Sequence, residues 1–355
     1  MSLRDRLAAL FAVPAAATPA AATPDPRPLI RAEVEAMLRL TQDGRPNGNG
    51  LSQATRDLDA MRWNLKALAG HFGAEFEARA AQRVVLSPAV TGLASRSPRQ
   101  QDFASDWLLF WARETRSAPR LHRGLWESCF IAQSLYEAGL IRQGVRGAAM
   151  FDGRNSMAAL MASMGVATRI HRTAPAYDRP TAPDLEGLHY TDIVARDLFD
   201  QFVSAVWADD APVMDDLDFV WAMQWMHHQG SIQSGLDAAK AAMQLLRPGG
   251  LLVITTELNL RDDETLDHSP TVLFQRRHFQ ALAEDLRADG HVVAAIDVDI
   301  GSDVFDRYVD TPPYGPEGTA FPPEMLARLA TAPHIKVSVD GFPCTSFGFV
   351  VTCRG

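Results

Sequence analysis

Residues that could do acid–base chemistry stand at the ends of apolar runs in the second half of the chain. His227 follows the apolar run 217–224, and Glu257 stands at the end of a later run, with Asn259 close behind it. A histidine titrates near neutral pH and a carboxylate accepts protons, so His227 and Glu257 are candidates for a general base. His268 is a third candidate catalytic residue, and Asn259 could orient a hydroxylated ligand. Histidines without a catalytic role, and an asparagine that anchors a loop, are the alternatives.

Two further groups of residues could bind such a ligand. Arg276 and Arg277 open a predicted helix and could hold an acidic sugar or a phosphate by paired hydrogen bonds. Basic residues suit the start of a helix poorly, which favours a role beyond the helix itself. Tyr308 and Tyr314, with Asp310 between them, belong to the segment YVDTPPY, which could cover the ligand. A rigid, packed connection is the alternative for that segment.

The elements that must position these residues alternate between apolar strands and helices from about residue 144. This alternation predicts a mostly parallel sheet with helices packed on it. Ligands of such sheets bind beyond the carboxyl ends of the strands, where the candidate residues stand. Segment 301–345 is too long for a simple turn and is predicted to be an insert. The predicted strands are 144–151, 166–173, 201–210, 217–224, 251–258, 292–300 and 346–354, and the predicted helices are 154–165, 231–246 and 276–290.

The first 141 residues are predicted to be helical. Residues 1–28 read as a short helix followed by a flexible Ala/Pro linker, and residues 29–141 as a helical region before the α/β domain 142–355. The run of turn-forming residues at 43–50 predicts a break between helices. Five apolar residues after it recur at helical spacing and are assigned to packing, namely Leu58, Met61, Leu65, Leu68 and Phe72.

The most specific local signal is the turn Arg247–Gly250, Arg-Pro-Gly-Gly, between a predicted helix and an apolar strand. With Asp218-Phe219-Val220-Trp221 upstream, it resembles the turn before the fifth strand of class I methyltransferases. DFASDWLLFWARE, HRGLWESCFIAQSLYEAGLI, ITTELNL, LDHSPTVLFQRRHF and YVDTPPY resemble a bacterial group of S-adenosylmethionine methyltransferases linked to cell-surface polysaccharide synthesis. The resemblance implies a Rossmann-like α/β sheet with helices on both faces and an antiparallel last strand. It also implies methyl transfer to a sugar or another small acceptor.

The loop expected to hold the cofactor departs from this family's pattern. Relatives carry Gly-x-Gly-x-Gly after the first strand, because the backbone passes close to the cofactor. Here Ala149 and Phe151 match the first two glycines and Gly153 the third. Phenylalanine at that turn should block the pocket or fill it. Gly147, Phe151 and Gly153 are the candidate cofactor-binding residues of this segment.

The second strand departs as well. Relatives end it with a carboxylate that accepts hydrogen bonds from the cofactor ribose, whereas Arg172 stands there in this chain and has donors only. Arg172 could receive an anionic ligand or be solvated. Asp209 and Asp210 end the third strand, where the family often places an acid near the adenine amine, and a solvated acidic turn is the alternative.

Two functions follow from these patterns. One is a pseudoenzyme with an impaired or repurposed S-adenosylmethionine site, which binds a glycan, a partner protein or another ligand. The other is an active S-adenosylmethionine-dependent methyltransferase acting on a sugar or small-molecule acceptor. No HExxH or GxSxG motif occurs, which disfavours a zinc hydrolase or a serine hydrolase, and no metal site is predicted.

Composition and charge narrow the partners. The formal net charge is −9, and residues 1–130 hold 17 Lys and Arg against 13 Asp and Glu, whereas the remainder holds 17 against 30. An acidic second half disfavours nucleic acid. Three cysteines without a CxxC pair and no apolar run of membrane-spanning length predict a cytoplasmic protein. The helical N-terminal region could recruit a protein partner.

Overall fold

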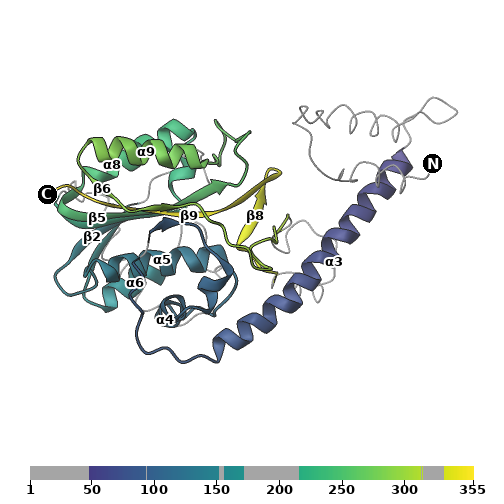
Figure 1. Cartoon of the computed structure of the whole chain (residues 1–355), viewed down its shortest axis with the longest axis horizontal. Helices are drawn as coiled ribbons and strands as arrows, with labels where there is room; N and C mark the ends of the chain where they lie inside the picture. Colours follow the sequence, from purple (N-terminus) through teal and green to yellow (C-terminus); the bar gives the residue numbers. More distant parts are fainter. Residues whose placement is uncertain (1–47, 93, 152–155, 172–215, 313, 315–331) are drawn as a thin grey trace, which may run out of the picture. The chain divides into compact units, whose positions relative to one another are not determined.

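A twisted sheet with helices on both faces organises the chain (Figure 1). The computed structural model describes residues 48–92, 94–151, 156–171, 216–312, 314 and 332–355. Over these residues the sheet runs in the order β3-β2-β4-β5-β9-β1-β7, and β6 and β8 also pair with β9. Its strands are β1 (Ser95–Arg96), β2 (Arg146–Phe151), β3 (Ala167–His171), β4 (Leu217–Met223), β5 (Leu246–Asn259), β6 (Val292–Val293), β7 (Ile296–Asp297), β8 (Lys336–Val339) and β9 (Phe342–Thr352).

The strand directions agree with the predicted fold. Strands β2, β3, β4 and β5 are parallel, and β9 runs antiparallel to β5 over nine paired residues, Leu251 with Thr352 to Asn259 with Cys344. The chain therefore has a Rossmann-like α/β fold with an antiparallel last strand. The predicted strand 201–210 lies outside the described residues. The predicted strand 292–300 is instead two short strands, β6 and β7.

Alternating side chains of each strand build two cores, one on each face of the sheet. On one face, Phe219 and Trp221 of β4 pack with α4, α5 and α6. On the other face, Val220 and Ala222 pack with α8 and α9. The helices are α3 (Gly48–Ala81), η1 (Gln100–Ala104), α4 (Asp106–Glu114), α5 (Arg123–Glu137), α6 (Ser156–Ser163), η3 (Met226–His228), α8 (Ile232–Met243) and α9 (Arg276–Ala288).

The Arg-Pro-Gly-Gly segment lies within β5 and bulges out of it. Leu246 pairs with Leu217 and Leu251 with Phe219, so the four residues between them bulge out of the ladder. Gly249 has φ +78°, which favours glycine, and a Cβ on Gly250 would lie 2.9 Å from the carbonyl oxygens of Arg247 and Leu217. The predicted turn is thus a bulge at the start of the strand.

The predicted helical region also supplies part of the sheet. Strand β1 pairs with β7 and β9, although the segment was predicted to be helical. Contacts divide the chain into Met1–Met61 and Arg62–Gly355, and the predicted boundary at residue 141 stays a prediction. Helix α3 begins at Gly48, inside the predicted break at 43–50. The apolar residues of α3 that were assigned to packing are exposed, as discussed below.

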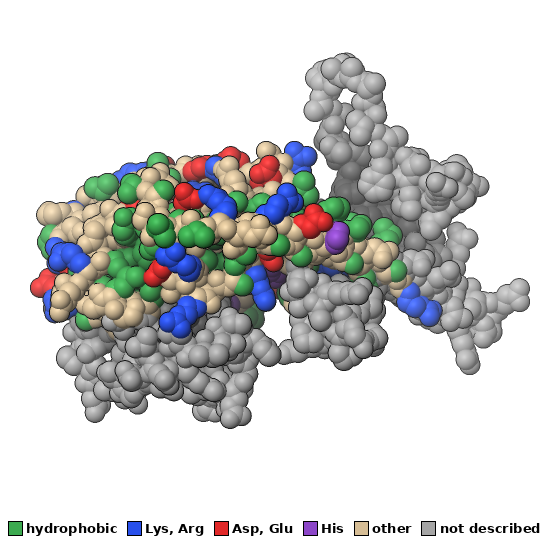
Figure 2. Space-filling model, turned by 90° about the horizontal axis from the view of Figure 1, so that it is seen from below, with side chains coloured by type: hydrophobic (Ala, Val, Ile, Leu, Met, Phe, Trp, Pro, Cys, Tyr) green, Lys and Arg blue, Asp and Glu red, His purple; other side chains and the backbone are tan. Residues whose placement is uncertain are grey.

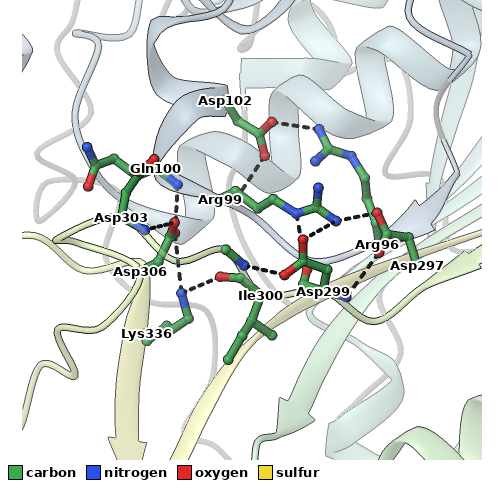
Figure 3. A network of polar contacts seen from close by, with 11 residues as sticks. Arg96, Arg99, Gln100, Asp102, Asp297, Asp299, Ile300, Asp303, Asp306 and Lys336 are labelled. Atoms are coloured by element: carbon green, nitrogen blue, oxygen red, sulfur yellow. Dashed lines mark hydrogen bonds and ion pairs between the residues drawn. The ribbon is translucent and has the colours of Figure 1, made fainter.

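A buried polar network fixes the insert to the rest of the domain (Figure 3). The ammonium group of Lys336, on β8, donates a hydrogen bond to the carbonyl of Ile300 at 2.9 Å and lies 3.4 Å from the carboxylate of Asp306. Asp306 also accepts a hydrogen bond from the backbone N–H of Gln100 at 2.7 Å. The side chains of Lys336 and Asp306 are each 1% exposed, so this ion pair sets the position of β8.

The outer surface of the described residues mixes hydrophobic side chains with charges of both signs on the face that Figure 2 shows. That face therefore carries no extended field of one sign. Within the described residues, no helix combines the length and the apolar character needed to cross a bilayer.

Candidate active site

Asp310 is the centre of a buried cluster built from three distant segments. Its Oδ1 atom lies 2.6 Å from the ammonium of Lys66 on α3 and accepts a hydrogen bond from the backbone N–H of Thr311 at 3.0 Å. Its Oδ2 atom lies 2.8 Å from Nδ1 of His334, just before β8. Burial raises the pKa of Asp310, but hydrogen bonds from His334 and Lys66 outweigh burial and hold this pKa below its ordinary value. Asp310 is therefore ionised at neutral pH.

The ionised carboxylate fixes the tautomer of His334. A carboxylate only accepts hydrogen bonds, so Nδ1 of His334 carries the hydrogen, and in the neutral ring Nε2 is then the basic atom. The side chain of His334 is 17% exposed, whereas that of Asp310 is 5% exposed. A buried carboxylate behind a partly exposed imidazole is the arrangement of a general base with its orienting group.

The two predicted tyrosines of YVDTPPY lie against this pair. The hydroxyl of Tyr308 donates a hydrogen bond to Asp310 at 3.4 Å, and the ring of Tyr314 packs edge-on against that of His334, with centroids 5.0 Å apart. The ammonium of Lys66 lies 5.4 Å from the centre of the Tyr314 ring. Burial, with the charge of Asp310 adding to it, raises the pKa of Tyr314 to about 12. Both tyrosines are therefore protonated donors at neutral pH.

The start of α5 joins His334 to a second polar cluster. The His122 ring stacks on that of His334, with centroids 4.8 Å apart, and the backbone N–H of Arg123 donates to the His334 carbonyl at 2.9 Å. The guanidinium of Arg123 contacts the carboxylate of Glu257 at 2.5 Å. The Glu257 carboxylate, predicted as a base, is thus engaged by Arg123, a partner that the sequence did not indicate.

Glu127, one turn further along α5, is a buried carboxylate with hydroxyl donors on two strands. It accepts hydrogen bonds from Thr255 of β5 at 3.2 Å and from Ser346 of β9. The amide of Gln224, at the end of β4, also donates to it at 3.2 Å. Burial raises the pKa of Glu127, and the charge of Arg123 opposes this rise. These groups line the sheet where β4 and β5 end, on the face covered by α5.

His227 lies on the opposite face of the sheet from Glu257. Its Nδ1 atom is 3.1 Å from the hydroxyl of Thr256, whose side chain points away from that of its neighbour Glu257 because strand residues alternate. His227 is 3% exposed, and burial lowers its pKa well below the ordinary value. The ring is therefore neutral, but these contacts give it a structural role and do not bring it together with Glu257.

Asn259 and His268 occupy places that fit loop anchoring. The amide of Asn259 donates to the carbonyl of Glu264 at 2.8 Å and accepts from the backbone N–H of Arg261 at 2.9 Å. The side chain of His268 is 84% exposed, and its Nε2 atom lies 3.9 Å from the carboxylate of Asp267. A catalytic role of His268 stays a prediction.

Arg276 and Arg277 begin α9, on the face of the sheet that α8 and α9 cover. Arg276 is half-buried and Arg277 is exposed. They are thus separated by the sheet from the cluster around Glu257, and their role in binding an anion stays a prediction.

The predicted cofactor residues fall largely outside the described ranges. Gly153, Arg172, Asp209 and Asp210 all lie there, and Phe151 is the last residue of β2. Gly147 is described fully: a Cβ on it would lie 2.1 Å from the ring of Phe219 on β4. This close approach assigns Gly147 to packing between β2 and β4, and its role in cofactor binding stays a prediction.

Strands β2 and β4 end at the same edge of the sheet. Phe151 is in register with Met223, so β2 and β4 end level with each other, at the edge where open α/β sheets bind ligands. Within the described ranges, no three His, Cys, Asp or Glu side chains are grouped so as to hold a metal ion.

Sequence reasoning missed Lys66, His122, Arg123, Glu127 and His334. Asp310 and His334 are separated by the segment 315–331, and no spacing rule links them. The one signal in the sequence that could have indicated His334 is its position in an insert rich in tyrosine, proline and acidic residues.

Comparisons with known proteins give a likeness of fold. The chain is similar to a solved S-adenosylmethionine-dependent methyltransferase from Clostridium acetobutylicum, at 8% identity and TM-score 0.32, over 64% of this chain and 91% of that one. It is similar to the [4+2]-cyclase SpnF, at 15% identity and TM-score 0.37, over 74% and 99%. It is also similar to an O-methyltransferase family protein from Burkholderia thailandensis, at 12% identity and TM-score 0.29, over 93% and 83%. No family model and no curated protein matches the chain. These scores are too low to indicate a function.

Proposed function

We propose that the chain is a methyltransferase that acts on a hydroxyl group of a small polar acceptor, with His334 as the general base. The observation that carries the proposal is the Asp310–His334 pair: an ionised, buried carboxylate orients a partly exposed imidazole. A hydroxyl is a poor nucleophile until a base takes its proton, and the contact of Nδ1 with Asp310 leaves Nε2 of His334 as the ring nitrogen that would accept it.

The surrounding residues suit a hydroxylated acceptor. The hydroxyls of Tyr308 and Tyr314 already donate to Asp310 and to the carbonyl of Ser338, so each can accept a hydrogen bond from a hydroxylated acceptor, and their rings can pack against the apolar face of a sugar. Arg123 and Glu257 neutralise each other, which leaves a site of mixed polarity rather than one suited to a strongly charged acceptor. A sugar or another small polyol is the acceptor class that these groups favour.

The cofactor implied by the sequence resemblance is S-adenosylmethionine, which supplies an electrophilic methyl group when it is bound. The level ends of β2 and β4 support this proposal, because ligands of open α/β sheets bind at that edge. The chain's own part of the reaction is to hold the acceptor, to accept its proton at His334 Nε2, and to stabilise the imidazolium through Asp310.

A pseudoenzyme that binds the same acceptor without methyl transfer is the second candidate. The sequence at Phe151 and Arg172 favours it, because a bulky ring and a donor-only side chain replace the glycine and carboxylate of the resembled family.

Turnover of S-adenosylmethionine tests the proposal. The purified chain is incubated with S-adenosylmethionine and a panel of monosaccharides and nucleotide sugars, and S-adenosylhomocysteine is measured. Formation that depends on one of these acceptors is expected. No formation above the acceptor-free control with any of them would contradict the proposed reaction and acceptor class.

A further inference from the structure

Helix α3 carries large side chains on two opposite faces. One face packs on its own domain, through Trp63, Lys66, Gly73 and Ala80. The other face is apolar and exposed: each of its side chains is 53–61% exposed, and they are Leu58, Met61, Leu65, Leu68 and Phe72. We call these five residues the α3 seam.

The spacing of the α3 seam specifies what covers it. The five positions are separated by three, four, three and four residues, which is the a and d pattern of a heptad repeat. This pattern gives a narrow stripe that knobs of a second helix fill, whereas a helix packed on a globular core has a wider apolar face. The seam therefore fits another α-helix.

The charges of α3 argue against a membrane surface as the occupant. The helix Gly48–Ala81 holds four basic residues and four acidic ones. One of the basic residues, Lys66, is buried against Asp310. A helix that lies on an anionic bilayer carries an excess of lysine and arginine on its polar face. Helix α3 has no such excess.

We propose that the α3 seam binds the α3 seam of a second copy of this chain in a two-stranded coiled coil.

The rest of the chain supports the choice of occupant. Among the described helices, α4, α5, α8 and α9 bury their apolar residues against the sheet or its neighbours. Compared with these four helices, α3 is thus the one whose exposed apolar stripe can pair with the α3 seam of another copy.

The area available predicts a reversible dimer. About 100 Å² per seam side chain is a typical area for burying one large aliphatic residue. Five such side chains on each copy give about 1,000 Å² in total, near the lower limit of a specific interface.

Analytical ultracentrifugation of the full chain across the micromolar range tests the proposal. The wild type is expected to dimerise, and Leu65→Glu combined with Leu68→Glu is expected to be monomeric with unchanged helical circular dichroism. The matched control, Ala67→Glu with Ala74→Glu, changes exposed residues outside the seam of the same helix and should still dimerise. A monomeric wild type, or a seam variant that dimerises like the control, would overturn the proposal.

Discussion

At the scale of single residues, the proposed chemistry depends on which side chains are ionised. Asp310 stays charged because Lys66 and His334 donate to it, and this charge orients the imidazole. His227 is the contrasting case, since its ring contacts the hydroxyl of Thr256 and burial keeps the ring neutral. Two histidines of one domain are thus held in different ways for different purposes.

Replacement of His334 should separate proton transfer from binding. His334→Gln removes the basic atom while keeping a polar side chain, and methyl transfer should fall by about 10²–10⁴-fold. Calorimetric affinity for S-adenosylmethionine should not change, because His334 contacts Asp310, His122 and Tyr314. An unchanged rate would exclude His334 as the base. His228→Gln, on the other face of the sheet, serves as the control.

The pH dependence of stability should report on His227. Its folded pKa is lowered, so the unfolded chain binds a proton below pH 6.5 that the folded chain does not, and stability falls with acidification. Between pH 7.5 and 5.5 this loss is roughly 1.4 kcal/mol. His227→Asn keeps an atom that can pair with Thr256 but does not titrate, so urea denaturation at the two pH values should show a smaller loss. Equal losses in both proteins would contradict the assignment.

At the scale of elements, the network of Figure 3 positions β8 and with it His334. Lys336 lies two residues after His334 and is anchored to Ile300 and Asp306. Helix α5 is held at the sheet in a comparable way, because the ring of Phe130 occupies the space where a Cβ on Gly348 would stand. The base is therefore supported by rigid elements although it precedes a short strand.

Two lysine–aspartate pairs of this chain should differ in their contribution to stability. Lys336→Met leaves Asp306 buried without its cation, which should cost about 3–5 kcal/mol. Lys240→Met breaks a pair whose side chains are 35% and 57% exposed, which should cost at most about 1 kcal/mol. Denaturant unfolding of both variants measures the difference, and similar losses would show that the Lys336 pair does not anchor β8.

The packing role assigned to Gly147 can be tested by relief of a steric clash. Gly147→Ala should destabilise the protein by about 1–3 kcal/mol, because the added Cβ meets the ring of Phe219. Adding Phe219→Leu should recover part of this loss relative to Phe219→Leu alone. A double-mutant cycle by thermal denaturation measures the coupling, and additive effects would contradict the packing assignment.

The elements of the α/β domain could be predicted from the sequence to a large extent. Strand β4 and helix α8 follow apolar periodicity and the cap at Ser231, which are local signals. The two-residue strand β1 was missed because so short a strand has no periodicity. The Asp310–His334–Lys66 cluster was out of reach because its members come from distant segments that only tertiary contacts bring together. Similarly, helical spacing cannot say whether Leu65 faces its own core or solvent.

At the scale of the whole molecule, the proposed site lies at one edge of the sheet, where β4, β5 and β9 meet α5 and the end of the insert. The α3 helix contributes Lys66 to this site from one face and offers the α3 seam on the other. Assembly through α3 and chemistry at Asp310 would thus be linked through one helix.

Calorimetric titration with S-adenosylmethionine and with S-adenosylhomocysteine tests the methyltransferase claim most directly. We expect the wild type to bind both ligands, with a heat of binding that saturates. The absence of heat at millimolar ligand, together with binding gained by Phe151→Gly combined with Arg172→Asp, would contradict it and would establish the pseudoenzyme instead.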